Sequence, residues 1–374
     1  MAEIKYKQLM QHIIAQIQNG SYTDKLPSEM ELCAQFQHSR QTVRNALAQL
    51  ESMHYITRRR GSGTYVNKET LSTMAPSRNG RQIGVLTTYI TDYIFPSILR
   101  GIEQTLSAAG YAMRLSSSCN SIANERAILL EYIAAPPCGL IVEGTKTALP
   151  NPNVALYRQL QAMGVPIVFL NGCYPELKQA VSVLMDDAQG GELLVDYLHS
   201  KGFSQLAGLF KSDDMQGVQR YEGFIKGIWK HGMRLQEQNL RWFSTESRKT
   251  LSSVLLPSML EIFRRCDAVV CYNDEIAVQL LRLLQQEKLF AEVVSFDRSH
   301  YSRFSAKPFL SLPHPKAQLG RIAARKLLAM AAGAEESSLL LPWRLPETEP
   351  TADSDAAKRA DSIQQGLRPE QGKE

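Results

Sequence analysis

From residue 81 onward, short apolar runs alternate with segments of helical periodicity, and this alternation constrains the fold more than any other feature of the sequence. It predicts strands at residues 83–87, 139–143, 166–171, 206–210, 268–272 and 293–296, and helices at 96–109, 216–231 and 275–286, with another between the second and third strands. Such alternation indicates parallel sheets with helices on both faces. About 265 residues are many for one sheet, so we expect two lobes.

Polar side chains gather where these strands end, which is where open parallel sheets bind their ligands. Carboxylates, amides and cations beside aromatic rings suit a small polyol, whose hydroxyls both donate and accept hydrogen bonds. The effector-binding candidates at these positions are Tyr93, Glu143, Lys211, Asp213, Gln216, Arg220, Asn273 and Asp297. Each has a structural alternative, because an Asp or Asn there can cap a helix and Glu143 can pair with Lys146.

The first part of the chain is basic. Residues 1–68 hold nine Lys and Arg against five Asp and Glu, so a net charge of only +1 remains on the other 306 residues. A small basic segment on a near-neutral chain indicates that this segment meets a polyanion.

The same segment has the helix pattern of a DNA-binding domain. Apolar residues at helical spacing predict a first helix over residues 6–17, and Ser28 and Glu31 form a capping box for a second helix. Ser39 is expected to cap a third helix, whose apolar stripe is Val43, Ala46, Leu47 and Leu50. Two short helices joined by a tight turn predict a helix-turn-helix.

Side chains able to contact DNA lie on the other face of the third helix. Arg40 and Arg44 can bond guanine or phosphate, and Gln41 can bond adenine. Residues 55–66 then predict two strands joined by a glycine tip that can approach a narrow groove, with arginines before it for phosphates. The alternatives are an amphipathic surface helix and a solvated basic edge.

Three motifs make this segment resemble the GntR-type winged helix: L-P-S-E at 26–29, S-R-Q-T-V-R-N-A-L at 39–47 and G-S-G-T-Y-V at 61–66. The resemblance implies that the third helix enters the major groove and the glycine tip the minor groove, with Glu29 near the bases or orienting an arginine. The DNA-binding candidates are then Glu29, Arg40, Gln41, Thr42, Arg44, Arg58, Arg60, Gly61, Ser62 and Gly63. His38 departs from the pattern, which is usually apolar there.

The rest of the chain resembles the sugar-sensing core of LacI- and galactose-type repressors and of periplasmic sugar-binding proteins. The motifs are D-D-A-Q-G-G at 186–191, R-Y-E-G-F at 220–224, C-Y-N-D-E-I-A at 271–277 and V-V-S-F-D at 293–297. The implied fold is an α+β winged helix-turn-helix head followed by an α/β body of two Rossmann-like lobes, periplasmic-binding-protein-like of type I. In that family the sugar is usually held by the residues matching Arg220, Asn273 and Asp297.

This pairing of head and body, together with E-G-T-K-T-A-L-P-N-P-N at 143–153, F-K-S-D-D-M-Q-G-V-Q-R at 210–220 and H-P-K at 314–316, is similar to the family of arabinose-responsive repressors. The resemblance implies L-arabinose or a related sugar as the effector. Arg298 stands where a second acidic residue is common, which leaves the identity of the sugar open.

These patterns divide the chain into a DNA-binding head at residues 1–69, a polar linker at 70–80, an effector-binding and dimerisation body at 81–346, and a polar tail at 347–374 that we expect to be disordered. Six cysteines without a C-x-x-C pair predict packed, reduced thiols and no metal site. No apolar run approaches the roughly 20 residues of a membrane span, so we expect a cytoplasmic protein without a membrane anchor.

The sequence therefore predicts a sugar-responsive transcriptional repressor without a cofactor, a homodimer that binds double-stranded operator DNA until the sugar releases it. An activator, or a response to another small sugar or polyol, stays open. An enzyme-like body of the aminotransferase type would need a Schiff-base lysine and a phosphate cradle, and neither motif is found, so we expect no enzyme. A basic head and no signal peptide disfavour a transport binding protein.

Overall fold

The computed structural model describes residues 24–52, 55–59, 62–67, 81–91, 93–177, 179–303, 305 and 307–346, and residues 6, 9, 10, 12–14, 16, 17, 21 and 22 before them. The chain forms two compact units, Met1–Arg81 and Gln82–Glu374, which we call the head and the body. The predicted linker and tail lie outside the described residues, as do Arg60 and Gly61 of the predicted DNA site. The predicted boundaries at residues 69, 80 and 346 therefore stay predictions.

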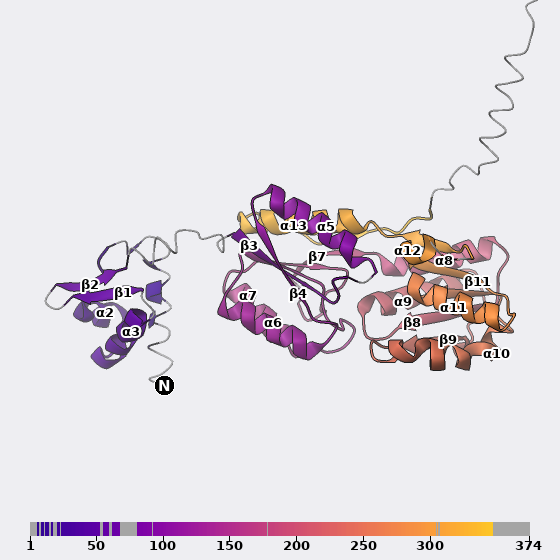
Figure 1. Ribbon diagram of the computed structural model, residues 1–374, viewed down its shortest axis with the longest axis horizontal. Helices are drawn as coiled ribbons and strands as arrows, with labels where there is room; N and C mark the ends of the chain where they lie inside the picture. Colours follow the sequence, from indigo (N-terminus) through magenta and orange to yellow (C-terminus); the bar gives the residue numbers. More distant parts are fainter. Residues whose placement is uncertain are drawn as a thin grey trace, which may run out of the picture. The chain divides into compact units, whose positions relative to one another are not determined.

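The head is a winged helix-turn-helix, as the sequence predicts. Its elements after the first helical segment are α2 Glu29–Phe36, α3 Arg40–Ser52, β1 Ile56–Arg59 and β2 Gly63–Val66 (Figure 1). The two strands form an antiparallel hairpin in which Ile56 lies opposite Val66. The predicted apolar stripes meet in one core, made of Leu9, Ile13, Ile17, Leu26, Leu32, Val43, Ala46, Leu47, Leu50, Ile56 and Val66.

Local hydrogen bonds fix where α2 and α3 begin. The Ser28 hydroxyl accepts from the Glu31 amide at 3.3 Å, and the Glu31 carboxylate accepts from the Ser28 amide at 2.7 Å, which confirms the capping box. The Ser39 hydroxyl accepts from the Thr42 amide at 3.2 Å, so Ser39 caps α3 as predicted. Between the helices, Gln37 has the left-handed conformation, with φ 51°, that turns the chain sharply.

Two parallel sheets form the body. The first has the order β13-β7-β6-β5-β3-β4 and the second β12-β11-β10-β8-β9. The strands of the first lobe are β3 Gln82–Thr87, β4 Ala112–Ser117, β5 Gly139–Val142, β6 Ile167–Leu170, β7 Val181–Met185 and β13 Leu339–Leu341. Those of the second lobe are β8 Leu206–Lys211, β9 Leu240–Phe243, β10 Ala268–Cys271, β11 Glu292–Asp297 and β12 Leu310–Pro313. The sequence did not predict β4, β7, β9, β12 and β13, and all of these except β7 are edge strands.

Helices cover both faces of each sheet, as predicted. The first lobe has α5 Phe95–Ala108, α6 Ile122–Ala134, α7 Val154–Ala162 and α13 Lys316–Ala331. The second has α8 Asp187–Ser200, α9 Met215–Lys230, α10 Leu260–Phe263, α11 Asp274–Gln286 and α12 His300–Arg303. Helices α5 and α13 pack together on one face of the first sheet and α6 and α7 cover the other (Figure 1). In the second lobe α8 and α9 pack on one face and α10 and α11 on the other.

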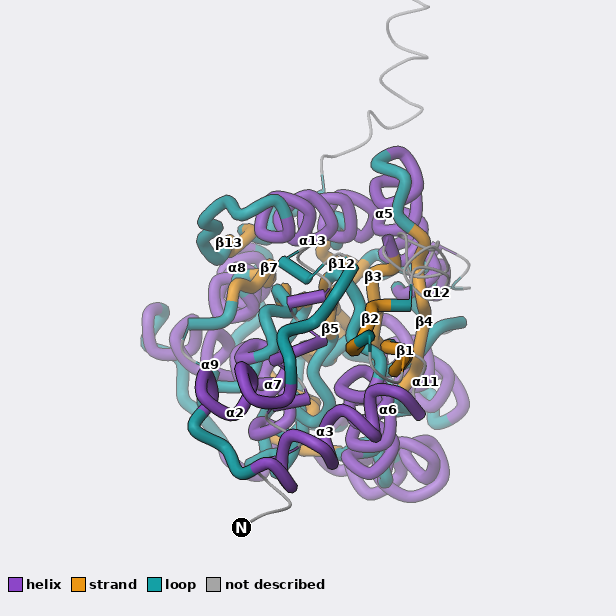
Figure 2. The backbone as a smooth tube through the Cα atoms, turned by 90° about the vertical axis from the view of Figure 1, so that its left-hand side faces the viewer, coloured by secondary structure: helices purple, strands orange, loops and turns teal. Residues whose placement is uncertain are grey.

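The described chain passes between the lobes at three places. It enters the second lobe after β7 and returns to the first after β12, through α13 to β13, which pairs with β7 (Figure 2). After β13 it reaches the second lobe again, where the Trp343 ring packs 5.2 Å from the Phe296 ring. One of the apolar core clusters of the body contains residues of both lobes.

Helices α8 and α9 approach each other until their backbones touch. A Cβ added to Gly223 would lie 1.8 Å from the carbonyl oxygen of Ala188, and one added to Gly191 would lie 2.2 Å from the carbonyl oxygen of Arg220. Only residues without a side chain fit there. This contact places Arg220 of α9 beside the first residue of α8, Asp187.

We expect Gly223→Ala to lower the free energy of unfolding of the body by about 1–3 kcal/mol, because the added methyl group must push two helix backbones apart. Thermal unfolding followed by circular dichroism measures this loss. Lys226→Ala, at an exposed position of the same helix, is the matched control and should change the midpoint little. Equal midpoints for both variants would contradict the close packing of α8 and α9.

Candidate functional site

A cavity of about 100 Å3 lies between the two lobes, at the carboxyl ends of their strands. This volume suits one small molecule rather than an extended chain. Seven of the eight predicted effector-binding residues line the cavity: Tyr93, Glu143, Lys211, Gln216, Arg220, Asn273 and Asp297. Other lining residues that the sequence prediction omitted are Thr88, Asn120, Asn171, Asp187, Asp214, Arg248, Tyr272, Glu275 and His314.

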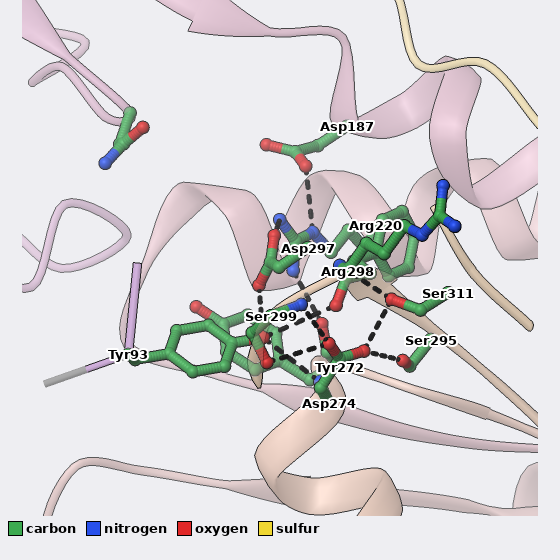
Figure 3. A network of polar contacts seen from close by, with 12 residues as sticks. Tyr93, Asp187, Arg220, Tyr272, Asp274, Ser295, Asp297, Arg298, Ser299 and Ser311 are labelled. Atoms are coloured by element: carbon green, nitrogen blue, oxygen red, sulfur yellow. Dashed lines mark hydrogen bonds and ion pairs between the residues drawn. The ribbon is translucent and has the colours of Figure 1, made fainter. Parts of the chain in front are cut away.

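Arg220 is the central cation of this site. Its side chain is buried, and its Nε donates to Asp187 Oδ1 at 2.8 Å. One Nη donates to the Tyr272 carbonyl at 2.5 Å and the other to Asp297 Oδ1 at 3.5 Å (Figure 3). The guanidinium also lies 4.2 Å from the centre of the Phe296 ring. Burial alone would lower the pKa of Arg220, but the carboxylates of Asp187 and Asp297 raise it, so the side chain stays cationic.

Asp297 connects the two lobes through Tyr93. The Tyr93 hydroxyl, on the loop after β3 in the first lobe, donates to Asp297 Oδ2 at 2.7 Å. The same hydroxyl accepts from the backbone amide of Asp274 in the second lobe at 3.1 Å. Tyr93 thus lines the cavity and links the two lobes through these hydrogen bonds.

Glu143 supplies a buried carboxylate from the first lobe. It accepts from both the amide (3.1 Å) and the hydroxyl of Thr88, and from the Asn171 amide group at 2.9 Å. Burial raises the pKa of Glu143, while these hydrogen bonds oppose the rise. The alternative that Glu143 pairs with Lys146 is wrong, since the Lys146 ammonium forms an ion pair with Glu246.

Lys211 lies between two carboxylates at the end of β8. Its ammonium is 2.7 Å from Asp213 Oδ1 and 2.8 Å from Asp214 Oδ2. Burial would lower the pKa of Lys211, but the two carboxylates raise it. Asp214 caps α9 and lines the cavity, whereas the Asp213 carboxylate accepts from the Thr245 amide at 2.9 Å and does not line it. Asp213 is therefore placed behind the site rather than in it.

Asn273 caps a helix at the edge of the cavity. Its side-chain Oδ1 accepts from the Ile276 amide at 3.1 Å and caps α11. The residue also lines the cavity, with its side chain largely buried. Gln216, in the first turn of α9, lines the cavity as well and is half-buried.

Three further contacts join the lobes beside the cavity. The Asn120 amide group donates to the Thr245 hydroxyl at 2.6 Å, and Lys146 pairs with Glu246. The Met215 amide donates to the Thr147 hydroxyl at 3.0 Å. The segment 143–153 thus contributes both a cavity carboxylate, that of Glu143, and contacts to the opposite lobe.

In the head, the described members of the predicted DNA-binding set lie at the start of α2, on α3 and on the hairpin. Arg40, Gln41 and Arg44 are exposed, and Arg44 Nε lies 3.3 Å from Glu29 Oε2. Glu29 therefore orients an arginine, one of the two placements expected for it. The Gln41 side-chain amide donates to Asn45 Oδ1 at 3.0 Å, and Thr42 is partly buried beside Ser39.

The described basic residues of the hairpin differ in their exposure to solvent. Arg58 is partly buried, with Nε 3.7 Å from Glu51 Oε2 and one Nη donating to the Arg44 carbonyl at 3.4 Å. Arg59, one of the arginines expected to contact phosphates, is exposed and lies 5.2 Å from the centre of the Tyr65 ring. Ser62 and Gly63 are exposed at the tip, and Gly63 has φ 129°, a conformation that favours glycine.

Within the described part of the chain, no group of His, Cys, Asp and Glu side chains has the arrangement of a metal site. The described helices include none that is long and apolar enough to cross a membrane.

Comparison with known families matches both units. Residues 5–66 match the bacterial regulatory proteins of the gntR family, and residues 195–347 match the periplasmic binding protein-like domain. A solved periplasmic binding protein/LacI transcriptional regulator from Alkaliphilus metalliredigens, complexed with D-xylulofuranose, is similar to 71% of this chain and to 97% of its own chain, with a TM-score of 0.61 at 17% identity. That likeness shows the fold of the body.

Two relatives match nearly the whole chain. The arabinose metabolism transcriptional repressor of Geobacillus stearothermophilus is 38% identical over 334 residues, covering 87% of this chain and 91% of the relative. The protein of the same name from Halalkalibacterium halodurans is 35% identical over 340 residues, covering 87% and 89%. With its GntR-type head and LacI-type body, the chain belongs to the family of the arabinose metabolism transcriptional repressors.

Proposed function

We propose that this protein represses transcription by binding operator DNA through its head, and that L-arabinose or a closely related pentose in the body releases it. The observation that carries this proposal is the small cavity between the lobes, lined by groups that can bond several hydroxyls at once. The relatives named for arabinose metabolism support the choice of sugar, and so does the LacI-type regulator that was solved with a five-carbon sugar.

Arg220 has the donors that such a ligand needs. A guanidinium carries five N–H groups, and three of them donate to Asp187, Asp297 and the Tyr272 carbonyl among the described residues. Arg220 lines the cavity, and its two other N–H groups can donate to adjacent sugar hydroxyls. The carboxylates of Asp297 and Glu143 approach from the two lobes and can accept from the same hydroxyls.

Sugar binding would act on DNA binding by stabilising the closed body. A ligand that bonds Arg220 in one lobe and Glu143 in the other favours the conformation in which Tyr93 reaches Asp297. Release requires that the sugar binds the conformation with weak DNA affinity more tightly than the other, since equal affinity would shift nothing. We propose a homodimer, in which two heads bind two half-sites of a roughly palindromic operator.

We expect Arg40→Ala and Arg44→Ala each to weaken specific operator binding by about 1–3 kcal/mol, because both guanidinium groups lie on the exposed face of α3. Fluorescence anisotropy with labelled operator measures the affinity. Arg282→Ala, an exposed arginine of the body, makes the same charge change and should have little effect. Wild-type affinity in both head variants would show that α3 does not contact the bases.

The dependence of operator affinity on salt should distinguish Arg58 from Arg59, the two arginines in the described part of the hairpin. Replacing an arginine that contacts phosphate lowers the slope of log affinity against log salt by about one. We expect this for Arg59→Ala, because its guanidinium is exposed, and a smaller change for Arg58→Ala, because Glu51 already pairs with Arg58. Unchanged slopes for both variants would place the hairpin away from the DNA backbone.

Replacing Arg220 should abolish release by the sugar while leaving operator binding nearly unchanged, because the head has its own core. Arg220→Ala leaves two buried carboxylates without their cation, so Arg220→Lys, which keeps the charge and loses the planar fork, is the sharper variant. Calorimetry with L-arabinose should show at least about a tenfold loss of affinity. Arg234→Ala, an exposed arginine just after α9, is the control. A lysine variant that binds and responds to the sugar as wild type does would place the effector site elsewhere.

A further inference from the structure

The turn after β11 has an unusual backbone. Asp297 and Arg298 are consecutive non-glycine residues with positive φ, 92° and 36°. Residues other than glycine rarely adopt a positive φ, and they keep it only where the surrounding structure holds the backbone in place. Because the first of the two is the cavity residue Asp297, whatever holds this turn also determines where its carboxylate lies.

Asp274, the first residue of α11, holds the turn from behind. Its carboxylate is fully buried and does not line the cavity. One oxygen accepts from the Ser299 amide at 2.6 Å and from the Ser299 hydroxyl at 2.8 Å. The other accepts from the Ser311 hydroxyl at 2.5 Å and from the Ser295 hydroxyl (Figure 3). Four donors from β11, the turn and β12 therefore meet on one side chain.

The contacts continue from this carboxylate to the turn itself. The Ser311 hydroxyl accepts from the Arg298 amide at 2.8 Å, and the Lys316 ammonium donates to the carbonyls of Asp297 and Arg298. On the cavity side, the backbone amide of Asp274 donates to the Tyr93 hydroxyl, the group that bonds Asp297. Asp274 thus bonds Tyr93 directly and is linked to Asp297 only through the residues that follow it in the turn.

We propose that Asp274 is a positioning residue for the sugar site: its carboxylate holds residues 297–299 in the left-handed turn that points Asp297 at Arg220 and Tyr93. The proposal rests on the proposed function, because the group being positioned is a sugar-binding carboxylate. The carboxylate accepts from all four partners. An amide of the same shape accepts on one side only, so either the Ser299 amide faces an NH2 group or the Ser295 and Ser311 hydroxyls must turn from donating to accepting. In both cases the charge-assisted hydrogen bonds are lost.

Asp274→Asn in the full-length protein tests this role. We expect its affinity for L-arabinose, measured by calorimetry, to fall at least tenfold, and its operator affinity without sugar to stay at the wild-type value. Ser295→Ala removes one hydrogen bond to the same carboxylate from the strand rather than from the turn, so it is the matched control and should change sugar affinity less than threefold. Equal affinities in Asp274→Asn and wild type would overturn the proposal.

A double-mutant cycle separates positioning from general support of the fold. If Asp274 acts through Asp297, then Asp274→Asn should weaken sugar binding no further in a protein that already carries Asp297→Asn. Losses that multiply would show that Asp274 acts independently of Asp297 and would overturn the proposal. If circular dichroism shows that Asp274→Asn does not fold, Ser299→Ala takes its place in the same cycle, because it removes one turn hydrogen bond and leaves the carboxylate intact.

Sugar binding by the wild-type protein distinguishes a failure of this proposal from a failure of the proposed function. A wild-type protein that binds none of L-arabinose, D-xylose and D-ribose would overturn the proposed function, and the positioning role with it. A wild-type protein that binds L-arabinose, together with an unaffected Asp274→Asn variant, would overturn only the positioning role.

Discussion

The body depends on one buried cation. A guanidinium removed from water is tolerated only when carboxylates and carbonyls compensate it, and breaking such a buried pair is strongly destabilising. Arg220 obtains this compensation from Asp187 at the start of α8 and from Asp297 at the end of β11. Three segments that lie far apart in the sequence are therefore tied to a single group. The glycines between α8 and α9 permit the helix contact that places this group at the cavity.

The two lobes supply different chemistry to the cavity. The second lobe contributes the charged groups Arg220, Lys211 and Asp297, whereas the first contributes Tyr93 and the hydrogen-bonded carboxylate of Glu143. The hydrogen bond from Tyr93 to Asp297 joins the lobes at the cavity, and the contacts of Asn120, Lys146 and Thr147 join them beside it. A ligand that bonds groups of both lobes would therefore favour this arrangement over one in which the lobes are apart.

Much of this organisation follows from local patterns. The capping residues Ser28 and Ser39, the apolar stripes of the head and the buried central strands other than β7 were predictable, because each depends on spacing along a few residues. The ends of parallel strands share one edge of a sheet, so the positions of Arg220, Asn273 and Asp297 at the cavity also followed from the sequence. The edge strands β4, β9, β12 and β13 were missed because a strand with one neighbour lacks a long buried run.

The sequence by itself therefore determined the winged-helix head, the alternating α/β body and the set of polar residues at strand ends. Only the tertiary structure decided which member of each neighbouring pair faces the cavity. Asp214 lines the cavity and Asp213 does not, because the Asp213 carboxylate accepts a hydrogen bond from the Thr245 amide, which follows β9. Likewise Lys146 pairs with Glu246 of the opposite lobe rather than with nearby Glu143. The hydrogen bonds of the buried Asp274 carboxylate connect α11 with β11, the turn after it and β12. No spacing along the chain predicts that these segments come together.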